Sequence, residues 1–176
     1  MKYDPDKHRR RSIRLRGYDY ASAGAYFVTI CVQGRLCRFG TVVNGVLTLN
    51  DAGRMVQATW EAFRERFPTL TPSAAVAMPN HFHAIVALAD QPIHGAQLGD
   101  IVGAFKSLTT NAYIFGVRER GWLPFDQRLW QRNYYEHVIC DEADLARIRD
   151  YIEANPARWD ADRLHPAAAP NRFNQE

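Results

Sequence analysis

The order in which strand-like and helix-like segments follow one another constrains the fold of this chain more than any other feature. Residues 26–33 are rich in aromatic and β-branched side chains, which is typical of a strand, and an Asn-Gly pair within 41–48 predicts a tight hairpin. A helix follows from residue 50 or 51 to about 66. Its apolar stripe consists of Val56, Trp60, Phe63 and Phe67.

Four more segments complete the order: strands at 73–78 and 81–88, a helix at 98–115, a strand at 129–139, and a helix from a cap at Asp141 to Asn155. This order predicts an α+β fold in which helices pack on a largely antiparallel sheet, with ferredoxin-like or RRM-like topology. In the helix at 98–115, we expect Lys106 to face solvent. The expected inward side chains are Ile101, Phe105, Leu108 and Ala112.

The chain contains no internal repeat and no linker long enough to divide it, which indicates one domain. We expect a basic arm at 1–20, a folded domain at 21–160, and a tail at 161–176 that is loose after Trp159. At 176 residues, with 47% hydrophobic residues, the chain is large and apolar enough for a packed core, which excludes a disordered protein.

Several compositional features exclude membrane and secreted classes. Apolar stretches such as 84–89 are too short to span a bilayer, and residues 1–7 contain no apolar region of the signal-peptide kind. Cys31, Cys37 and Cys140 lack Cys-x-x-Cys spacing, so we expect free, mostly buried thiols. These features predict a cytoplasmic protein.

The positive charge of the chain is almost entirely arginine. The net charge is only +3 at pH 7, and lysine occurs only at positions 2, 7 and 106. Arginine matches phosphate oxygens with a planar fork, although a genome of high G+C content also favours arginine codons. A local cluster is better evidence for gripping a nucleic-acid backbone, and it consists of Arg9, Arg10, Arg11, Arg14 and Arg16.

Two histidines at 81 and 83 form the first candidate site. Side chains alternate along a strand, so His81 and His83 share one face while Phe82 packs into the other. Such a pair can hold one divalent cation, but paired histidines on a strand are often only hydrogen-bonded.

The second candidate site is the segment from Asp150 to Pro156. Tyr151 and Asn155 are four residues apart on a predicted helix and therefore share a face. Taken alone, Tyr151 would pack its ring beside the apolar stripe and Asn155 would cap the helix before Pro156. Taken together with the histidines, they make a metal site with a tyrosine nucleophile chemically sensible.

With these motifs, the sequence resembles the HUH single-tyrosine transposases. The segment Met78-Pro79-Asn80-His81-Phe82-His83-Ala84-Ile85-Val86 is similar to their His-hydrophobe-His signature. The segments 130–137 (Trp-Gln-Arg-Asn-Tyr-Tyr-Glu-His) and 151–156 (Tyr-Ile-Glu-Ala-Asn-Pro) resemble the REP-associated tyrosine transposases in particular, and the likeness spans about residues 14–159.

The resemblance implies a metal-dependent endonuclease and strand transferase that acts on single-stranded, hairpin-forming DNA through a 5′-phosphotyrosine. It implies Tyr151 as the nucleophile and His81, His83 and Asn155 as ligands of Mg²⁺ or Mn²⁺. Insertion-sequence relatives carry Gln where Asn155 stands, so Glu153 or a water could be the third ligand instead. It also implies a nucleoid-associated protein, and it leaves a homodimer open. The expected DNA contacts are the arginine cluster together with Lys106, Trp130, Gln131 and Arg132.

Some alternatives remain open at this point. Tyr134 and Tyr135 compete with Tyr151 as the nucleophile, although neither has an amide side chain four residues later; we expect them to stack on bases or pack in the core. His137 is expected to be a core histidine or a phosphate contact. At the level of function, the alternatives are a non-catalytic binder of single-stranded DNA or RNA and a rolling-circle initiator nickase.

Overall fold

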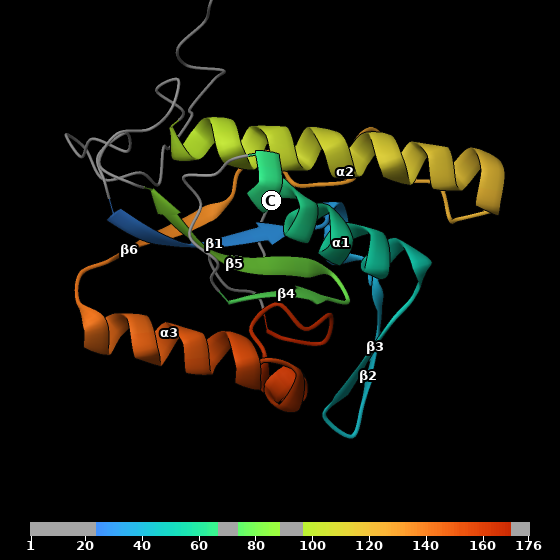
Figure 1. Cartoon of the computed structure of the whole chain (residues 1–176). Helices are drawn as coiled ribbons and strands as arrows, with labels where there is room; N and C mark the ends of the chain where they lie inside the picture. Colours follow the sequence, from blue (N-terminus) through green and yellow to red (C-terminus); the bar gives the residue numbers. More distant parts are fainter. Residues whose placement is uncertain (1–23, 67–73, 89–96, 170–176) are drawn as a thin grey trace, which may run out of the picture.

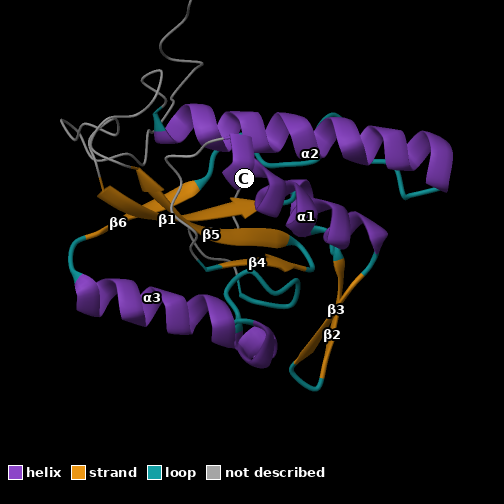
Figure 2. Ribbon diagram, viewed as in Figure 1, coloured by secondary structure: helices purple, strands orange, loops and turns teal. Residues whose placement is uncertain are grey.

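The computed structural model describes residues 24–66, 74–88 and 97–169 of the chain. The helices and strands alternate along the chain as the sequence predicts (Figures 1 and 2). The elements are β1 (Gly24–Cys31), the 3₁₀ turn η1 (Gln33–Arg35), β2 (Gly40–Val43), β3 (Val46–Leu49), α1 (Asp51–Arg66), β4 (Ala75–Met78), β5 (His81–Leu88), α2 (Leu98–Arg120), β6 (Tyr135–Ile139), α3 (Glu142–Ala154) and the 3₁₀ turn η3 (Pro156–Ala161).

The main sheet has four strands in the order β4-β5-β1-β6, and every neighbouring pair is antiparallel. Strand β5 lies between β1 and β4, so the β1–α1–β4 connection spans one intervening strand. Together with α2 and β6, this gives the β-α-β-β-α-β arrangement of ferredoxin-like folds. The predicted fold class is therefore confirmed.

Helices cover both faces of this sheet: α1 and α2 lie on one face and α3 on the other (Figures 1 and 2). Alternate residues of β1 and β5 enter the larger core beneath α1 and α2, among them Tyr26, Val28, Phe82 and Ala84. The residues between them face α3, where Phe27 and Ile85 pack against Ile148 and Ile152. Period-two alternation along β5 thus assigns His81 and His83 to the α3 face.

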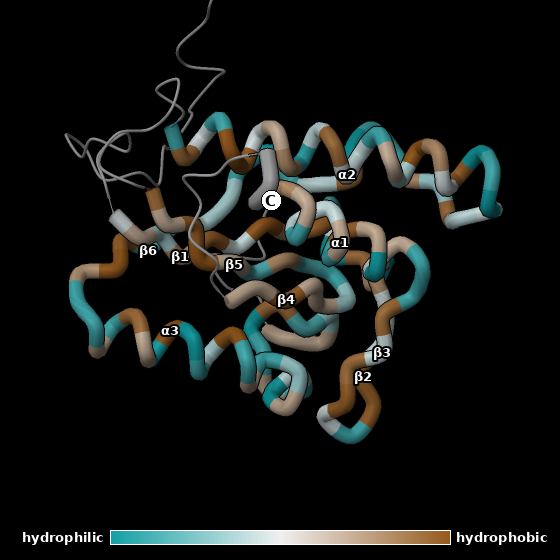
Figure 3. Tube along the Cα trace, in the orientation of Figure 1, coloured by the Kyte–Doolittle hydropathy of each residue, from teal (hydrophilic) through white to brown (hydrophobic). Residues whose placement is uncertain are grey.

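A separate hairpin, β2–β3, projects beside the sheet (Figure 1). Its turn requires two left-handed residues, and Asn44 and Gly45 supply them with φ of 52° and 76°. Val43 and Val46 flank the turn and are exposed, so apolar residues reach the tip of the hairpin (Figure 3).

Three expectations about elements are wrong. The strand predicted at 129–139 contains only Tyr135–Ile139, because Trp130 forms an isolated bridge with Val32 and turns its ring into the core. Helix α2 extends to Arg120, where Gly121 ends it in the left-handed conformation. The inward face of α2 includes Thr109 and Tyr113, whereas Leu108 is partly exposed.

The expectation of a chain that is loose after Trp159 is also wrong, as far as residue 169. Trp159 and Leu164 are buried, and the Leu164 carbonyl accepts a hydrogen bond of 2.8 Å from Asn80 Nδ2. Of the three free cysteines, only Cys31 is buried, whereas Cys37 and Cys140 are exposed. Among the described residues, no helix is both long and apolar enough to cross a membrane.

Candidate active site

A tight turn positions the two histidines at one end of the sheet. Pro79 and Asn80 join β4 to β5, and the register of this hairpin pairs Met78 with His81. The two imidazole rings are side by side, with their centroids 4.4 Å apart, and both side chains are almost completely buried. The pair lies beneath the C-terminal half of α3.

The amide of Asn80 fixes the orientation of His81. Asn80 Nδ2 donates to the carbonyls of Arg35 and Leu164, so its Oδ1 is left to accept from His81 Nδ1 at 2.8 Å. This hydrogen bond places the proton of a neutral His81 ring on Nδ1 and the free lone pair on Nε2, as in histidines that bind metals.

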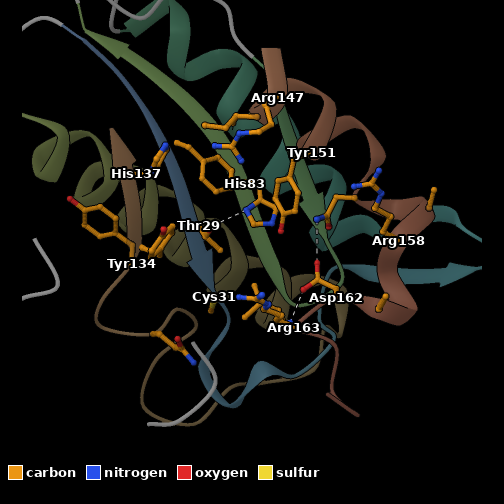
Figure 4. A pocket seen from close by; sticks show the side chains of 18 of the residues that line it. Thr29, Cys31, His83, Tyr134, His137, Arg147, Tyr151, Arg158, Asp162 and Arg163 are labelled. Carbon is orange, nitrogen blue, oxygen red and sulfur yellow. Dashed lines mark hydrogen bonds between the residues drawn. The ribbon is translucent and has the colours of Figure 1, made fainter. Parts of the chain in front are cut away.

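His83 has an equivalent partner on the neighbouring strand. Thr29 Oγ1 lies 2.8 Å from His83 Nδ1, and a hydroxyl can accept from Nδ1–H (Figure 4). Burial, together with the neighbouring His81, lowers the pKa of His83 well below its usual value, and burial lowers the pKa of His81 to about 3. Both rings are therefore neutral near pH 7, which is the state that can ligate a metal.

Helix α3 brings the tyrosine and the amide to the same place. Asp141 caps the helix by accepting from Asp144 N, and Ile148 and Ile152 fix its sheet-facing side. Tyr151 lies beside that stripe with its ring edge-on to Phe27 and 5.4 Å from His83, measured between ring centroids (Figure 4). Asn155, one turn later, is 2% exposed.

Three buried atoms here have no hydrogen-bond partner among the described residues: Nε2 of His81, Nε2 of His83 and Oδ1 of Asn155. Leaving a buried polar atom unpaired costs about 1–3 kcal/mol each, so such atoms normally indicate a missing partner. All three atoms offer lone pairs and none is a donor in the tautomers above. The three lone pairs can therefore bind a cation, whereas another hydrogen-bond acceptor would find no donor among them.

A carboxylate joins the group. Ligand atoms of His81, His83 and Asp162 lie within 4.8 Å of one another, so these side chains can hold a metal ion. Asp162 also accepts a hydrogen bond of 3.2 Å from Asn155 Nδ2.

The site opens into a cavity of about 870 Å³. Tyr151 is 37% exposed at its wall. Burial and then the charge of Asp162 raise the pKa of Tyr151 to about 12, so its hydroxyl keeps its proton at neutral pH. The cavity wall is rich in arginine and tyrosine, namely Arg147, Arg158, Arg163, Tyr134 and Tyr135.

The chain matches no protein-family model. It is 37% identical over 187 residues to an uncharacterized protein of Haemophilus influenzae, covering 93% of this chain and 97% of that protein. It is also 25% identical over 142 residues to a protein of the same organism named "Putative REP-associated tyrosine transposase", covering 80% of this chain and 74% of that protein. The chain therefore resembles the REP-associated tyrosine transposases.

A solved structure of a REP-associated tyrosine transposase bound to a REP hairpin has the same fold. Its TM-score is 0.61 at 21% sequence identity, and the match covers 84% of this chain and 74% of the solved one. At this identity, the likeness supports the fold of the transposase family and leaves the roles of individual residues to the geometry above.

The structure brings together four of the residues expected at a transposase active site: His81, His83, Tyr151 and Asn155. Glu153, the alternative third ligand, is exposed on α3. Asp162 was missed because it lies in the segment expected to be a tail, and no spacing rule connects it to the other four.

Two of the expected DNA contacts have side chains that are engaged within the protein. Trp130 is only 4% exposed and donates from Nε1 to Thr109 Oγ1, so its ring is not accessible for stacking. Lys106 is half-buried: its Nζ donates to the carbonyls of Gln131, Arg132 and Asn133, and burial lowers its pKa to about 8.

Of the remaining expected contacts, Gln131 and Arg132 lie within the described residues and the arginine cluster does not. Gln131 lines the cavity of Tyr151 and, together with the exposed Arg132, a second cavity of about 410 Å³. The arginines of the N-terminal cluster, Arg9, Arg10, Arg11, Arg14 and Arg16, lie outside the described residues.

The competing side chains in β6 and just before it also lie near the site. Tyr134 and Tyr135 both line the cavity, and Lys106 Nζ is 5.5 Å from the centroid of the Tyr134 ring. His137 is not a core residue, because it lies at the cavity and pairs with Asp144 Oδ2 at 2.8 Å.

Proposed function

We propose that this transposase-family chain is a metal-dependent endonuclease and strand transferase for single-stranded, hairpin-forming DNA. One observation supports the proposal most strongly: the unpaired atoms of His81, His83 and Asn155 converge beside Tyr151. This site opens into a cavity. A tyrosine that only packed in the core would need no such group of lone pairs next to its ring.

Tyr151 is the proposed nucleophile. Its Oη forms a bond to the phosphorus of the scissile phosphate, and the bond from phosphorus to the 3′ oxygen of the preceding nucleotide breaks. The phenol loses its proton and the departing oxygen gains one, which leaves a 3′-hydroxyl and a 5′-phosphotyrosine. The phosphotyrosine conserves the energy of the broken bond, so rejoining is the same exchange in reverse.

Because the phenol keeps its proton at neutral pH, attack requires help from the site. His81, His83 and Asn155 would hold Mg²⁺ or Mn²⁺, and such a cation polarises the scissile phosphate. Hydrogen bonds with Asn80 and Thr29 already orient the two imidazole rings, and burial limits their movement. The ligand side chains are therefore in place before DNA binds.

The charged wall of the cavity supports a DNA substrate. Arg147, Arg158 and Arg163 lie around Tyr151, where their guanidinium groups can contact phosphates on either side of the scissile one. A family relative bound to a REP hairpin supports a hairpin as the substrate here. We propose that the arm at 1–20 adds phosphate contacts to the domain at 21–160, in a protein that works on the nucleoid in the cytoplasm.

The test is an SDS-resistant protein–DNA adduct formed on a labelled library of single-stranded hairpins with Mn²⁺ or Mg²⁺. Wild type is compared with Tyr151→Phe and with the double variant His81→Ala, His83→Ala. Tyr135→Phe is the matched control, since it removes a hydroxyl from the same cavity. We expect an adduct from wild type and the control only, and only with metal.

Two other results would redirect the proposal. An adduct that persists in Tyr151→Phe but is lost in Tyr134→Phe or Tyr135→Phe would move the nucleophile to β6 or to the residue before it. Tight hairpin binding by wild type without any adduct would identify the protein as a non-catalytic DNA-binding member of the family.

A further inference from the structure

Asp162 comes into the site from a segment that follows η3. The segment is anchored on both sides of it, because Trp159 and Leu164 are buried and the Trp159 ring lies 6.0 Å from the His81 ring between centroids. The carboxylate is thereby held within 4.8 Å of the His81 and His83 ring nitrogens.

Both oxygens of the Asp162 carboxylate are oriented by hydrogen bonds. Oδ1 accepts from Leu164 N at 2.6 Å, and Oδ2 accepts from Asn155 Nδ2 at 3.2 Å (Figure 4). The second contact turns the amide nitrogen of Asn155 toward Asp162, which leaves Asn155 Oδ1 as the buried atom without a partner. Each carboxylate oxygen still has a free lone pair, because an ionised carboxylate offers about four acceptor positions.

The other three candidate ligands are all neutral. Two imidazoles and an amide provide no charge to offset the two positive charges of a divalent cation, and taking an uncompensated ion out of water is costly. A carboxylate supplies that charge, and it is the hard oxygen donor that Mg²⁺ and Mn²⁺ favour.

We propose that Asp162 is a fourth ligand of the metal and orients the third, Asn155, through its other contacts. The proposal rests on the metal dependence put forward above. In this proposal, the Asp162 carboxylate supplies the negative charge of the site and also sets the direction in which the Asn155 amide oxygen points. Asp162 is then a direct determinant of metal affinity, although it lies outside the two sequence motifs.

The competing explanation is that Asp162 only positions Asn155, without touching the metal. A double-mutant cycle in the full chain separates the two roles. It compares wild type, Asp162→Asn, Asn155→Ala and the double variant by calorimetric titration with Mn²⁺. Asp162→Asn keeps an oxygen acceptor for Leu164 N and removes the charge. Asp160→Asn is the matched control, because it makes the same charge change at an exposed position two residues earlier.

We expect Asp162→Asn to weaken Mn²⁺ binding at least about tenfold and Asp160→Asn to change it less than about twofold. In the Asn155→Ala background, Asp162→Asn should still weaken binding by a similar factor. The visible absorption of Co²⁺ provides a second readout. We expect its spectrum to change in Asp162→Asn and to stay as in wild type in Asp160→Asn.

The outcomes separate this inference from the proposed function. If wild type binds Mn²⁺ and forms the DNA adduct but Asp162→Asn binds Mn²⁺ as tightly, Asp162 is not a ligand and the proposed function stands. The same conclusion follows if Asp162→Asn has no further effect once Asn155 is alanine. If wild type binds no Mn²⁺ and still forms the adduct, both the ligand role and the metal dependence are wrong.

Discussion

His81 is buried in its neutral form, and this makes the stability of the metal-free protein sensitive to acid. Its pKa is about 3 in the folded chain, against 6.5 for an ordinary histidine, because burial disfavours the protonated ring. The unfolded chain therefore takes up a proton first as pH falls. The stabilising effect of neutral His81 is complete above pH 6.5 and is lost progressively as pH falls from there toward 3.

We predict that, with a chelator present, the free energy of unfolding falls by about 2 kcal/mol between pH 7 and pH 5 on account of His81 alone. Urea unfolding at the two pH values measures this change. In His81→Gln the decrease should be smaller by that amount, since glutamine does not titrate. Equal decreases in wild type and His81→Gln would contradict the assignment.

The sequence located most of the site residues because local geometry connects them. His81 and His83 are two apart on a strand, and Tyr151 and Asn155 are four apart on a helix, so each pair shares a face whatever the rest of the fold does. Asp162 has no such relation to either pair. It reaches them because buried Trp159 and Leu164 fold the chain back, which depends on tertiary packing that periodicity does not encode.

At the scale of elements, Gly103 and Gly116 of helix α2 lie in contrasting surroundings. A Cβ on Gly116 would lie only 2.1 Å from the Trp122 ring, whereas a Cβ on Gly103 would meet nothing within 4 Å. Trp122 is held in this position because its backbone N–H donates to the Gly116 carbonyl after the left-handed Gly121.

We predict opposite effects of alanine at these two positions. Gly116→Ala should destabilise the protein by about 1–3 kcal/mol through overpacking, and Gly103→Ala should stabilise it by about 0.5–1 kcal/mol through helix propensity. Urea unfolding of the two variants tests the contrast, with Gly103→Ala as the matched control on the same helix. A stabilising Gly116→Ala would mean that Trp122 does not pack over the helix.

The segment from Leu129 to Asn133 shows why element boundaries were predicted less well than elements. It was predicted as part of a strand despite its polar content, but Trp130 fills the core and the next three carbonyls bind Lys106. From the sequence alone, a lysine that donates hydrogen bonds to loop carbonyls cannot be distinguished from a lysine on a solvated helix face. The wrong strand boundary and the unexpected hydrogen bonds of Lys106 therefore have the same cause.

For the whole molecule, the order of segments was enough to predict the ferredoxin-like topology, because strands, helices and short connections leave few arrangements of the sheet. The proposed metal site exists in the folded chain and not in the unfolded one, so the thermal stability should depend on the metal concentration.

We predict that Mn²⁺ at a hundred times its dissociation constant stabilises the protein by about 2.7 kcal/mol. For a chain of this size, that corresponds to a rise in Tm of roughly 5–10 °C. Differential scanning fluorimetry with Mn²⁺ and after chelation measures the rise. The His81→Ala, His83→Ala variant should show no rise, and an equal rise there would place the binding elsewhere in the protein.

The side-chain amide of Asn80 accepts a hydrogen bond from His81 through Oδ1 and donates one to the Leu164 carbonyl through Nδ2. One ligand of the proposed metal site is thus oriented through a residue that lies 84 positions after Asn80 in the chain. During synthesis on the ribosome, the histidines emerge long before Leu164 does. Until Leu164 emerges, the Asn80 amide nitrogen has only the Arg35 carbonyl as its partner, so the alignment of His81 is completed only after Leu164 has been synthesised.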